Sequence, residues 1–229
     1  FKGTPTRGAA EIARAIEGVG GEMNAFTTRE YTAFYVRVLD ESLDLALEIL
    51  SDVIWSPAFD ADEVEAERQV ILEEISMVED APDDLVHEVL AETLYPGHPL
   101  GRSTLGTRDT IERMAGSAIA GYHARHYQPS CIAVSAAGNL DHEAVVDGVR
   151  RHLTSRPAGE PTALGDEVPV PCSAATRVLG RATEQAHLAL GIPALPWRDP
   201  DRYALDIVKN AIAKTRAIAA PSTPAAATQ

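Results

Sequence analysis

The segment from Asp60 to Glu79 limits what this chain can fold into more than any other, because it carries the pattern of a helix with one buried side. Asp60 is a favourable N-cap residue, and Glu63 three positions later completes a capping-box pattern. At about 100° per residue, such a helix carries a broad apolar stripe. The stripe consists of Val64, Val70, Ile71, Ile75 and Val78, whereas Glu65, Arg68, Gln69, Glu73, Ser76 and Glu79 are expected on the solvated side.

Two acidic residues of this segment, Glu67 and Glu74, break the pattern. They lie about two turns apart and fall inside the apolar stripe. An ionised carboxylate that is buried without a partner is strongly destabilising, so each must meet a cation, share a proton or face a cleft. A divalent metal is one solution. The alternative is a helix at the edge of the fold whose carboxylates meet Lys or Arg from elsewhere, and helix geometry alone leaves both open.

Helical and strand periodicities alternate along the rest of the chain. Helices are expected at about 8–19, 40–54, 82–94, 108–126, 142–153 and 199–213. A β-hairpin is expected over 24–39, where a strand rich in aromatic and β-branched residues follows a turn. Further strands are expected at 131–137 and 177–190. This order predicts an α+β fold in which helices pack on a mainly antiparallel sheet.

Residues 156–175 interrupt these patterns. They are rich in Pro, Ala and Gly and show no periodicity, as is typical of a linker. A first domain is therefore expected over 1–155, and a second domain is expected to begin at 176. Residues 221–229 form a low-complexity tail that is expected to be disordered.

Charge and cysteine content narrow the classes of function. The net charge of −14 argues against a nucleic-acid binder, because phosphate backbones require a basic face. No apolar stretch is long enough for a membrane span. Cys131 and Cys172 are too few for a disulfide framework, so reduced thiols in a cytoplasmic protein are expected, with a disulfide between them as the alternative. Because position 1 is Phe and not Met, the chain is expected to begin at a cut end.

Several segments, in this order, resemble one family of enzymes. They are Phe1-Lys2-Gly3-Thr4, Gly20-Gly21-Glu22-Met23-Asn24-Ala25-Phe26-Thr27, Glu67-Arg68-Gln69-Val70-Ile71-Leu72-Glu73-Glu74, His98-Pro99-Leu100-Gly101-Arg102, Gly138-Asn139-Leu140-Asp141 and Glu184-Gln185-Ala186-His187. Together they resemble the zinc peptidases with an inverted His-x-x-Glu-His motif, peptidase family M16, which includes mitochondrial processing peptidases, insulinases and pitrilysins. The likeness is to the bacterial processing-peptidase branch and covers about 1–208.

The resemblance implies a function and a set of site residues. The family's fold would be expected, in incomplete form, and its activity would be zinc-dependent hydrolysis of peptide or unfolded polypeptide substrates. By position, Glu74 would be a Zn²⁺ ligand and Glu67 would assist catalysis. Asn24, Ala25 and Phe26 match the family's edge strand, to which substrate adds as a further strand. For Asn24 the alternative, a residue that only shapes the entry to the hairpin, stays open.

The sequence also departs from the family. The His-x-x-Glu-His motif is expected just before Phe1, and none of the histidines replaces it: His98 is expected in a turn, His123 and His126 at the exposed end of a helix, and His187 on a strand. After Val208 the family's Gly-rich loop is missing, so the second domain is expected to be truncated. The chain is therefore expected to be an inactive fragment of a zinc endopeptidase that works with a second domain or subunit. The alternatives are a non-catalytic subunit of the same fold, acting as a structural partner, and an unrelated α+β binding module.

Overall fold

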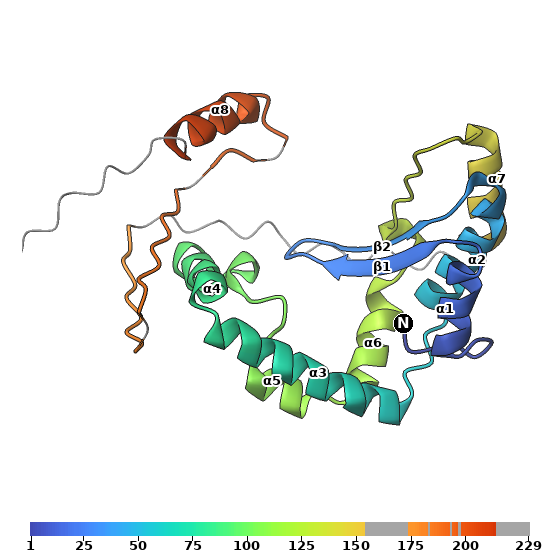
Figure 1. The fold of residues 1–229 in the computed structure, drawn as a ribbon, viewed down its shortest axis with the longest axis horizontal. Helices are drawn as coiled ribbons and strands as arrows, with labels where there is room; N and C mark the ends of the chain where they lie inside the picture. The colour runs from blue at the N-terminus through green and yellow to red at the C-terminus, as the bar shows by residue number, and fades with distance from the viewer. Residues whose placement is uncertain (154–173, 183, 193, 197, 214–229) are drawn as a thin grey trace, which may run out of the picture. The chain divides into compact units, whose positions relative to one another are not determined.

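The computed structural model describes residues 1–153, 174–182, 184–192, 194–196 and 198–213. The chain divides into two units, Phe1–Ala189 and Leu190–Gln229. The predicted linker and the low-complexity tail lie largely or wholly outside the described residues. Both units are drawn in Figure 1.

An antiparallel hairpin and the helices gathered at one of its ends form one layer of the fold (Figure 1). Strand β1 (Glu22–Thr27) pairs with β2 (Thr32–Arg37) in a register that sets Glu22 opposite Arg37 and Thr27 opposite Thr32. Helix α1 (Ala9–Glu17) packs against β1. Helix α2 (Leu43–Trp55), which follows the 3-10 turn η1 (Asp40–Ser42), packs against β2 and against α7 (His142–Leu153). The predicted hairpin and these three helices are confirmed.

Apolar side chains at helical spacing hold this layer together. Ile12 and Ile16 of α1 meet Ile49 of α2 in one buried cluster, and Leu47 and Ile54 of α2 meet Leu153 of α7 in another. The chain leaves α1 through Gly20, whose φ of 69° lies in the left-handed region that glycine adopts without strain. Gly20 and Gly21 therefore lie between the end of α1 and the start of β1.

A second group of helices follows. Helix α3 (Ala61–Asp80) packs against α4 (Pro82–Leu94) and against the short helix α5 (Arg108–Arg113). The 3-10 turn η2 (Pro99–Gly101) packs on α4, and α6 (Gly116–His126) leads to the 3-10 turn η3 (Pro129–Cys131). The single helix expected over 108–126 is therefore wrong, because the chain is extended at Met114 and Ala115.

The buried side of α3 is rotated from the predicted one. Val70 is 44% exposed, whereas the side chain of Arg68, expected in solvent, is only 16% exposed. Helix α5 covers this side, and the Arg68 guanidinium donates to the carbonyl oxygens of Ile111 and Met114. Ser76 is half-buried and accepts from Arg108 at 2.8 Å. At the start of α3, Asp60 accepts from the backbone of Asp62 and Glu63, as the cap predicts.

The strands predicted at 131–137 and 177–190 are wrong, because none of the residues that the structure describes in these two ranges belongs to a strand. Ile132 has extended backbone angles, φ −111° and ψ 129°, yet it belongs to no sheet. A strand needs a hydrogen-bonding partner, and the sheet of the described residues contains β1 and β2 alone. Val178 and Leu188 are 87% and 95% exposed, so the second apolar run has no packing partner there either.

The second unit contains helix α8 (Arg202–Ala213), close to the helix expected over 199–213. Within the described residues, none of the helices combines the length and hydrophobicity that a membrane span requires. The α+β class with an antiparallel pair of strands is confirmed, in an incomplete form.

Candidate functional site

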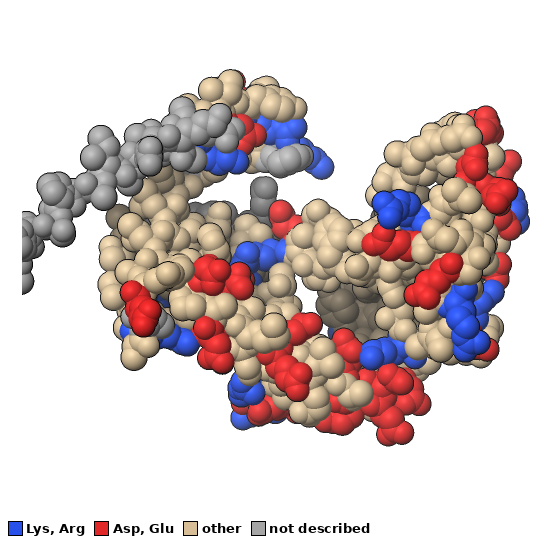
Figure 2. Space-filling model, in the orientation of Figure 1, with Lys and Arg blue, Asp and Glu red and all other residues tan. Residues whose placement is uncertain are grey.

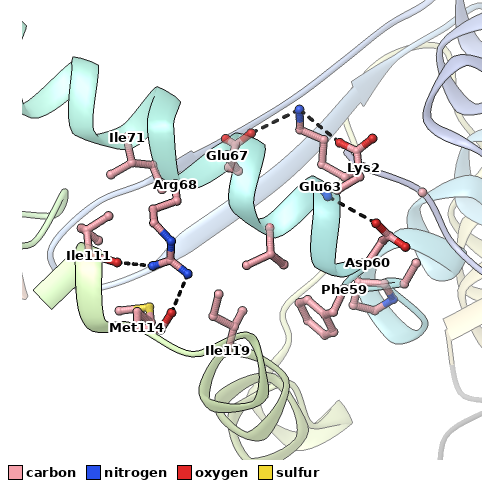
Figure 3. A pocket seen from close by; sticks show the side chains of 14 residues that line it. Lys2, Phe59, Asp60, Glu63, Glu67, Arg68, Ile71, Ile111, Met114 and Ile119 are labelled. Atoms are coloured by element: carbon pink, nitrogen blue, oxygen red, sulfur yellow. Dashed lines mark hydrogen bonds and ion pairs between the residues drawn. The ribbon is translucent and has the colours of Figure 1, made fainter.

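The N-terminal residues lie against the predicted catalytic helix. The Nζ atom of Lys2 is 3.3 Å from Oε2 of Glu67 and 3.7 Å from Oε2 of Glu63 (Figure 3). Glu63 and Glu67 are one turn apart on α3, so both carboxylates reach the same ammonium group. The hydrogen bond and charge of Glu67 are the main causes that raise the pKa of Lys2 above its ordinary value. Glu67 therefore meets a lysine, which was the expected alternative to a metal, and its side chain is 46% exposed and not buried in an apolar stripe.

The backbone on either side of Lys2 is anchored. Gly3 accepts a hydrogen bond from the backbone of Ala58 at 3.0 Å. Thr4, which is buried, donates from its hydroxyl to the Asp52 carboxylate at 2.8 Å, and Arg7 donates to the same carboxylate at 3.1 Å. These contacts tie the first residues of the chain to α2 and to the loop that precedes α3.

A mainly apolar cavity of about 260 Å³ lies beside the Lys2–Glu67 contact. Ile71 of α3, Ile111 at the end of α5 and Ile119 of α6 point toward it, and Arg68 joins α3 to α5 along its side (Figure 3). The buried side of α3 thus faces this cavity, and the Lys2–Glu67 contact lies at its border (Figure 3).

The predicted substrate strand borders a second cavity of about 490 Å³. Asn24 and Ala25 of β1 line it together with Phe1, Lys2 and Gly3, so the N-terminal segment lies between β1 and α3. The Asn24 side chain accepts a hydrogen bond from the backbone N–H of Ala25 at 2.8 Å.

Phe26 does not line this cavity. Its ring packs against Tyr31 and Tyr35 with centroids 5.9 and 6.3 Å apart. Within the described residues β1 pairs only with β2, so its other edge carries backbone groups that no strand of this part of the chain satisfies.

Glu74 lies farther along α3 and is exposed. Seven residues of helix place it about 10 Å along the axis from Glu67, with a direction that differs by only about 20°. Its side chain has no hydrogen bond or ion pair to any part of the chain that the structure describes. The two predicted carboxylates therefore share a side of the helix, but one is paired with a cation and the other is open to solvent.

The histidines do not assemble around these carboxylates. His98 caps η2 by accepting from the backbone of Leu100 at 3.1 Å, which confirms it as a turn residue. The ring of His123 is half-buried and hydrogen-bonded to the carbonyl of Ile54 at 2.7 Å, and His187 is exposed outside any strand. His123 and His126 therefore lie at the end of α6, as expected, but both are half-buried and not exposed. The strand expected for His187 is wrong.

The ligands needed for zinc are not all provided by the described residues. A catalytic zinc site takes three protein ligands at about 2.0–2.2 Å for nitrogen or oxygen. In the described ranges, no three His, Cys, Asp or Glu side chains are arranged so that they could hold a metal ion together. Glu67 and Glu74 are too far apart along α3 to bind one ion directly. Of the two predicted carboxylates, only Glu74 has no partner among the residues that the structure describes.

Acidic side chains also gather around the start of α3 (Figure 2). Asp60, Asp62 and Glu65 are exposed there, next to the half-buried Glu63. Lys2 and Arg68 bring cations to this region. The sequence gives neither residue a functional role, although both lie within segments that resemble the family. Their contacts in the folded chain single them out.

Comparison with known proteins identifies the family that the chain resembles. A family model described as Insulinase (Peptidase family M16) matches residues 1–108, and one described as Peptidase M16 inactive domain matches residues 117–219. An uncharacterized zinc protease of Streptomyces coelicolor is 41% identical over 218 residues, which cover 93% of this chain and 48% of that protein. The uncharacterized zinc protease YmxG of Bacillus subtilis is 37% identical over 212 residues, with 93% and 51% covered.

A solved structure agrees with these sequence matches. The crystal structure of a protease from Helicobacter pylori has a TM-score of 0.66 and 26% identity, and covers 75% of this chain and 40% of that chain. The chain spans about half the length of the curated relatives it matches.

Proposed function

Because the chain belongs to peptidase family M16, we propose that it forms part of a zinc-dependent metalloendopeptidase, an enzyme that hydrolyses peptide bonds. One observation carries the proposal: segments that are far apart in the sequence converge. Phe1 to Gly3 lie against Asn24 and Ala25 of β1 on one side, and Lys2 contacts Glu67 of α3 on the other. The first segment resembles the part of the family that follows the His-x-x-Glu-His motif. The second resembles the strand to which substrate adds, and the third resembles the helix that carries the third zinc ligand.

The surroundings of the two carboxylates support different roles for them. Glu74 is the metal ligand in this proposal, because its carboxylate is exposed and has no partner within the described ranges. Glu67 already holds a cation and is placed to assist catalysis through hydrogen bonds and charge without binding the metal. Zinc, when bound, polarises the scissile carbonyl and activates a water molecule.

The remaining zinc ligands and the general base are proposed to come from outside the described residues. The sequence contains no His-x-x-Glu-His motif, and the donors described above do not make a complete site. The chain by itself is therefore proposed to be inactive, with weak or no zinc binding.

The free edge of β1 supports an extended peptide as substrate. A peptide or an unfolded polypeptide would add there as a further strand, with backbone hydrogen bonds to the segment Asn24 to Phe26. Such binding depends mainly on the peptide backbone, so it suits a broad range of sequences. The acidic side chains near α3 favour peptides with basic residues.

A second domain or subunit of the same family is proposed to complete the enzyme. Exposed apolar residues beyond the linker, among them Val178, Leu188 and Leu190, are the kind of surface that a partner covers. In this proposal the first domain is 1–155, the linker is 156–175 and 176–229 begins the next domain. The two cysteines, too few for a disulfide framework, favour a cytoplasmic enzyme.

The alternative is a non-catalytic subunit that supports an active partner. The description of the second matching family model, an inactive domain, is compatible with it. The presence of both Glu67 and Glu74 favours the enzyme, because a non-catalytic relative would be expected to lose the acidic positions that the resemblance assigns to the site.

A chimera tests the proposal. In it, this chain replaces the segment it matches in the Streptomyces zinc protease, which supplies the remaining half. E74Q is expected to reduce bound zinc from about one ion per chain to near none, whereas E67Q is expected to keep the zinc and lose about 10–100-fold in activity. E73Q, which alters an exposed neighbour, is the matched control. Full zinc and full activity in E74Q would refute the metal role of Glu74, whereas a chimera that binds no zinc and cleaves nothing would favour the non-catalytic alternative.

A further inference from the structure

We propose that Lys2 is a positioning residue for Glu67: its ammonium group holds the Glu67 carboxylate in one direction, and Glu63 in turn holds the ammonium. This inference rests on the proposed role of Glu67 in catalysis. It adds to that role a residue from the start of the chain, on which the direction of the carboxylate depends.

The geometry shows one cation shared by two carboxylates. Lys2 Nζ is 3.3 Å from Glu67 and 3.7 Å from Glu63, so Glu67 is the closer partner (Figure 3). Without the ammonium group, two like charges one helical turn apart repel each other. Asp60, the N-cap residue of α3, accepts instead from the backbone N–H groups of Asp62 and Glu63. It therefore does not compete for Lys2.

The base of the Lys2 side chain is held in place. Gly3 and Thr4, which follow it, are fixed by the backbone of Ala58 and by the carboxylate of Asp52. A long, flexible side chain loses much of its freedom when it forms an ion pair. An anchored backbone reduces the range of directions from which the ammonium can approach Glu67, which is the condition for positioning.

The contact is too exposed to serve mainly as a support of the fold. The side chains of Lys2 and Glu67 are 49% and 46% exposed, and ion pairs in such surroundings contribute little to stability. Its effect is instead local. Side chains on a helix lean toward its start, and Lys2 holds Glu67 on that side, away from Glu74. The negative charge of Glu67 is compensated, and Glu74 remains the carboxylate that is open to a metal.

The 229-residue chain allows a first test that is independent of activity. NMR relaxation of the Glu67 side chain is compared between the wild type, K2M and K2R, with K209M as control. Lys209 is a matched control because it is also an exposed lysine, 3.3 Å from Asp206. K2M is expected to increase the mobility of the Glu67 side chain, K2R to restore its order and K209M to leave it unchanged. An unchanged Glu67 in K2M would overturn the proposal.

The chimera described above provides the second test. K2M is expected to lower kcat by about 10-fold, with KM, zinc content and Tm unchanged, and K2R is expected to recover most of the loss. In K2M/E67Q the two losses are expected to be far from additive, because both substitutions remove the same interaction. A fall in Tm or zinc content in K2M would indicate a structural role and overturn positioning.

The two tests separate this inference from the proposed function. If E67Q leaves kcat unchanged in an active chimera, Glu67 does not assist catalysis and positioning is overturned, while peptidase activity stands. If the chimera binds no zinc and cleaves nothing, the proposed function fails. The NMR comparison still decides whether Lys2 orders Glu67.

Discussion

Replacing Arg68 with methionine is expected to loosen the contact between α3 and α5. The Arg68 side chain is 16% exposed, and its guanidinium donates to the carbonyl oxygens of Ile111 and Met114, the latter at 2.8 Å. Methionine keeps most of the aliphatic volume beside the cavity but has no donor. The substitution therefore removes the hydrogen bonds with little change in packing.

The size of the effect follows from the surroundings of the two carbonyls. A hydrogen bond with a charged partner contributes about 1.5–3 kcal/mol when it is shielded from water. Ile111 is buried, and its carbonyl keeps only a longer bond of 3.3 Å from the backbone of Met114, whereas Met114 itself is exposed and its carbonyl can turn to water. The pair with Glu65 is at the surface and adds little. The expected loss is about 2–3 kcal/mol, or about 4–12 °C in Tm for a chain of this size.

Urea denaturation followed by circular dichroism measures this loss. R113M is the matched control, because Arg113 is exposed and pairs only with Asp109 across one helical turn. R113M is expected to change the free energy of unfolding by less than about 0.5 kcal/mol. Equal stability of R68M and R113M would refute the argument, since it would show that the α3–α5 contact does not depend on the guanidinium.

Three further outcomes are expected. G21A is expected to destabilise the fold by about 1–3 kcal/mol in the same assay, because an added Cβ would lie 3.0 Å from the Arg37 carbonyl oxygen. G180A is the control, because Gly180 lies in open space, and equal stability of the two variants would contradict the crowding argument. Burial raises the pKa of Asp52, but hydrogen bonds from two threonines and Arg7 outweigh burial and lower it below 3.8. The stabilisation that Asp52 provides is fully present above its ordinary pKa and is lost as pH falls through its lowered pKa. D52N is therefore expected to reduce the fall in the free energy of unfolding at acidic pH, measured by circular dichroism, and an unaltered pH dependence would refute this. The purified 229-residue chain is expected to show no chelator-sensitive cleavage of a fluorogenic peptide, and such cleavage would show that the chain completes a metal site by itself.

Local patterns were sufficient where local interactions decide the structure. The hairpin, the N-cap at Asp60, and the boundaries of α4 and α7 follow from turn residues, capping and periodicity, which act over a few positions. The motif segments also led to the family and to Glu67 and Glu74. The sequence pattern placed both carboxylates on one side of α3, and their spacing alone determines that relation.

Contacts between distant parts of the chain decided the rest. Arg68 was expected in solvent because a helical pattern does not reveal that α5 offers two carbonyl groups to that side. The apolar run at 131–137 has strand-like composition, but a strand also requires a neighbouring strand to pair with. A local sequence pattern does not show whether such a partner lies nearby in the fold. Lys2 and Glu67 are far apart in the sequence, so only the folded chain could show that one carboxylate is neutralised and the other left open. Charge compensation depends on distance in space, and sequence patterns record only distance along the chain.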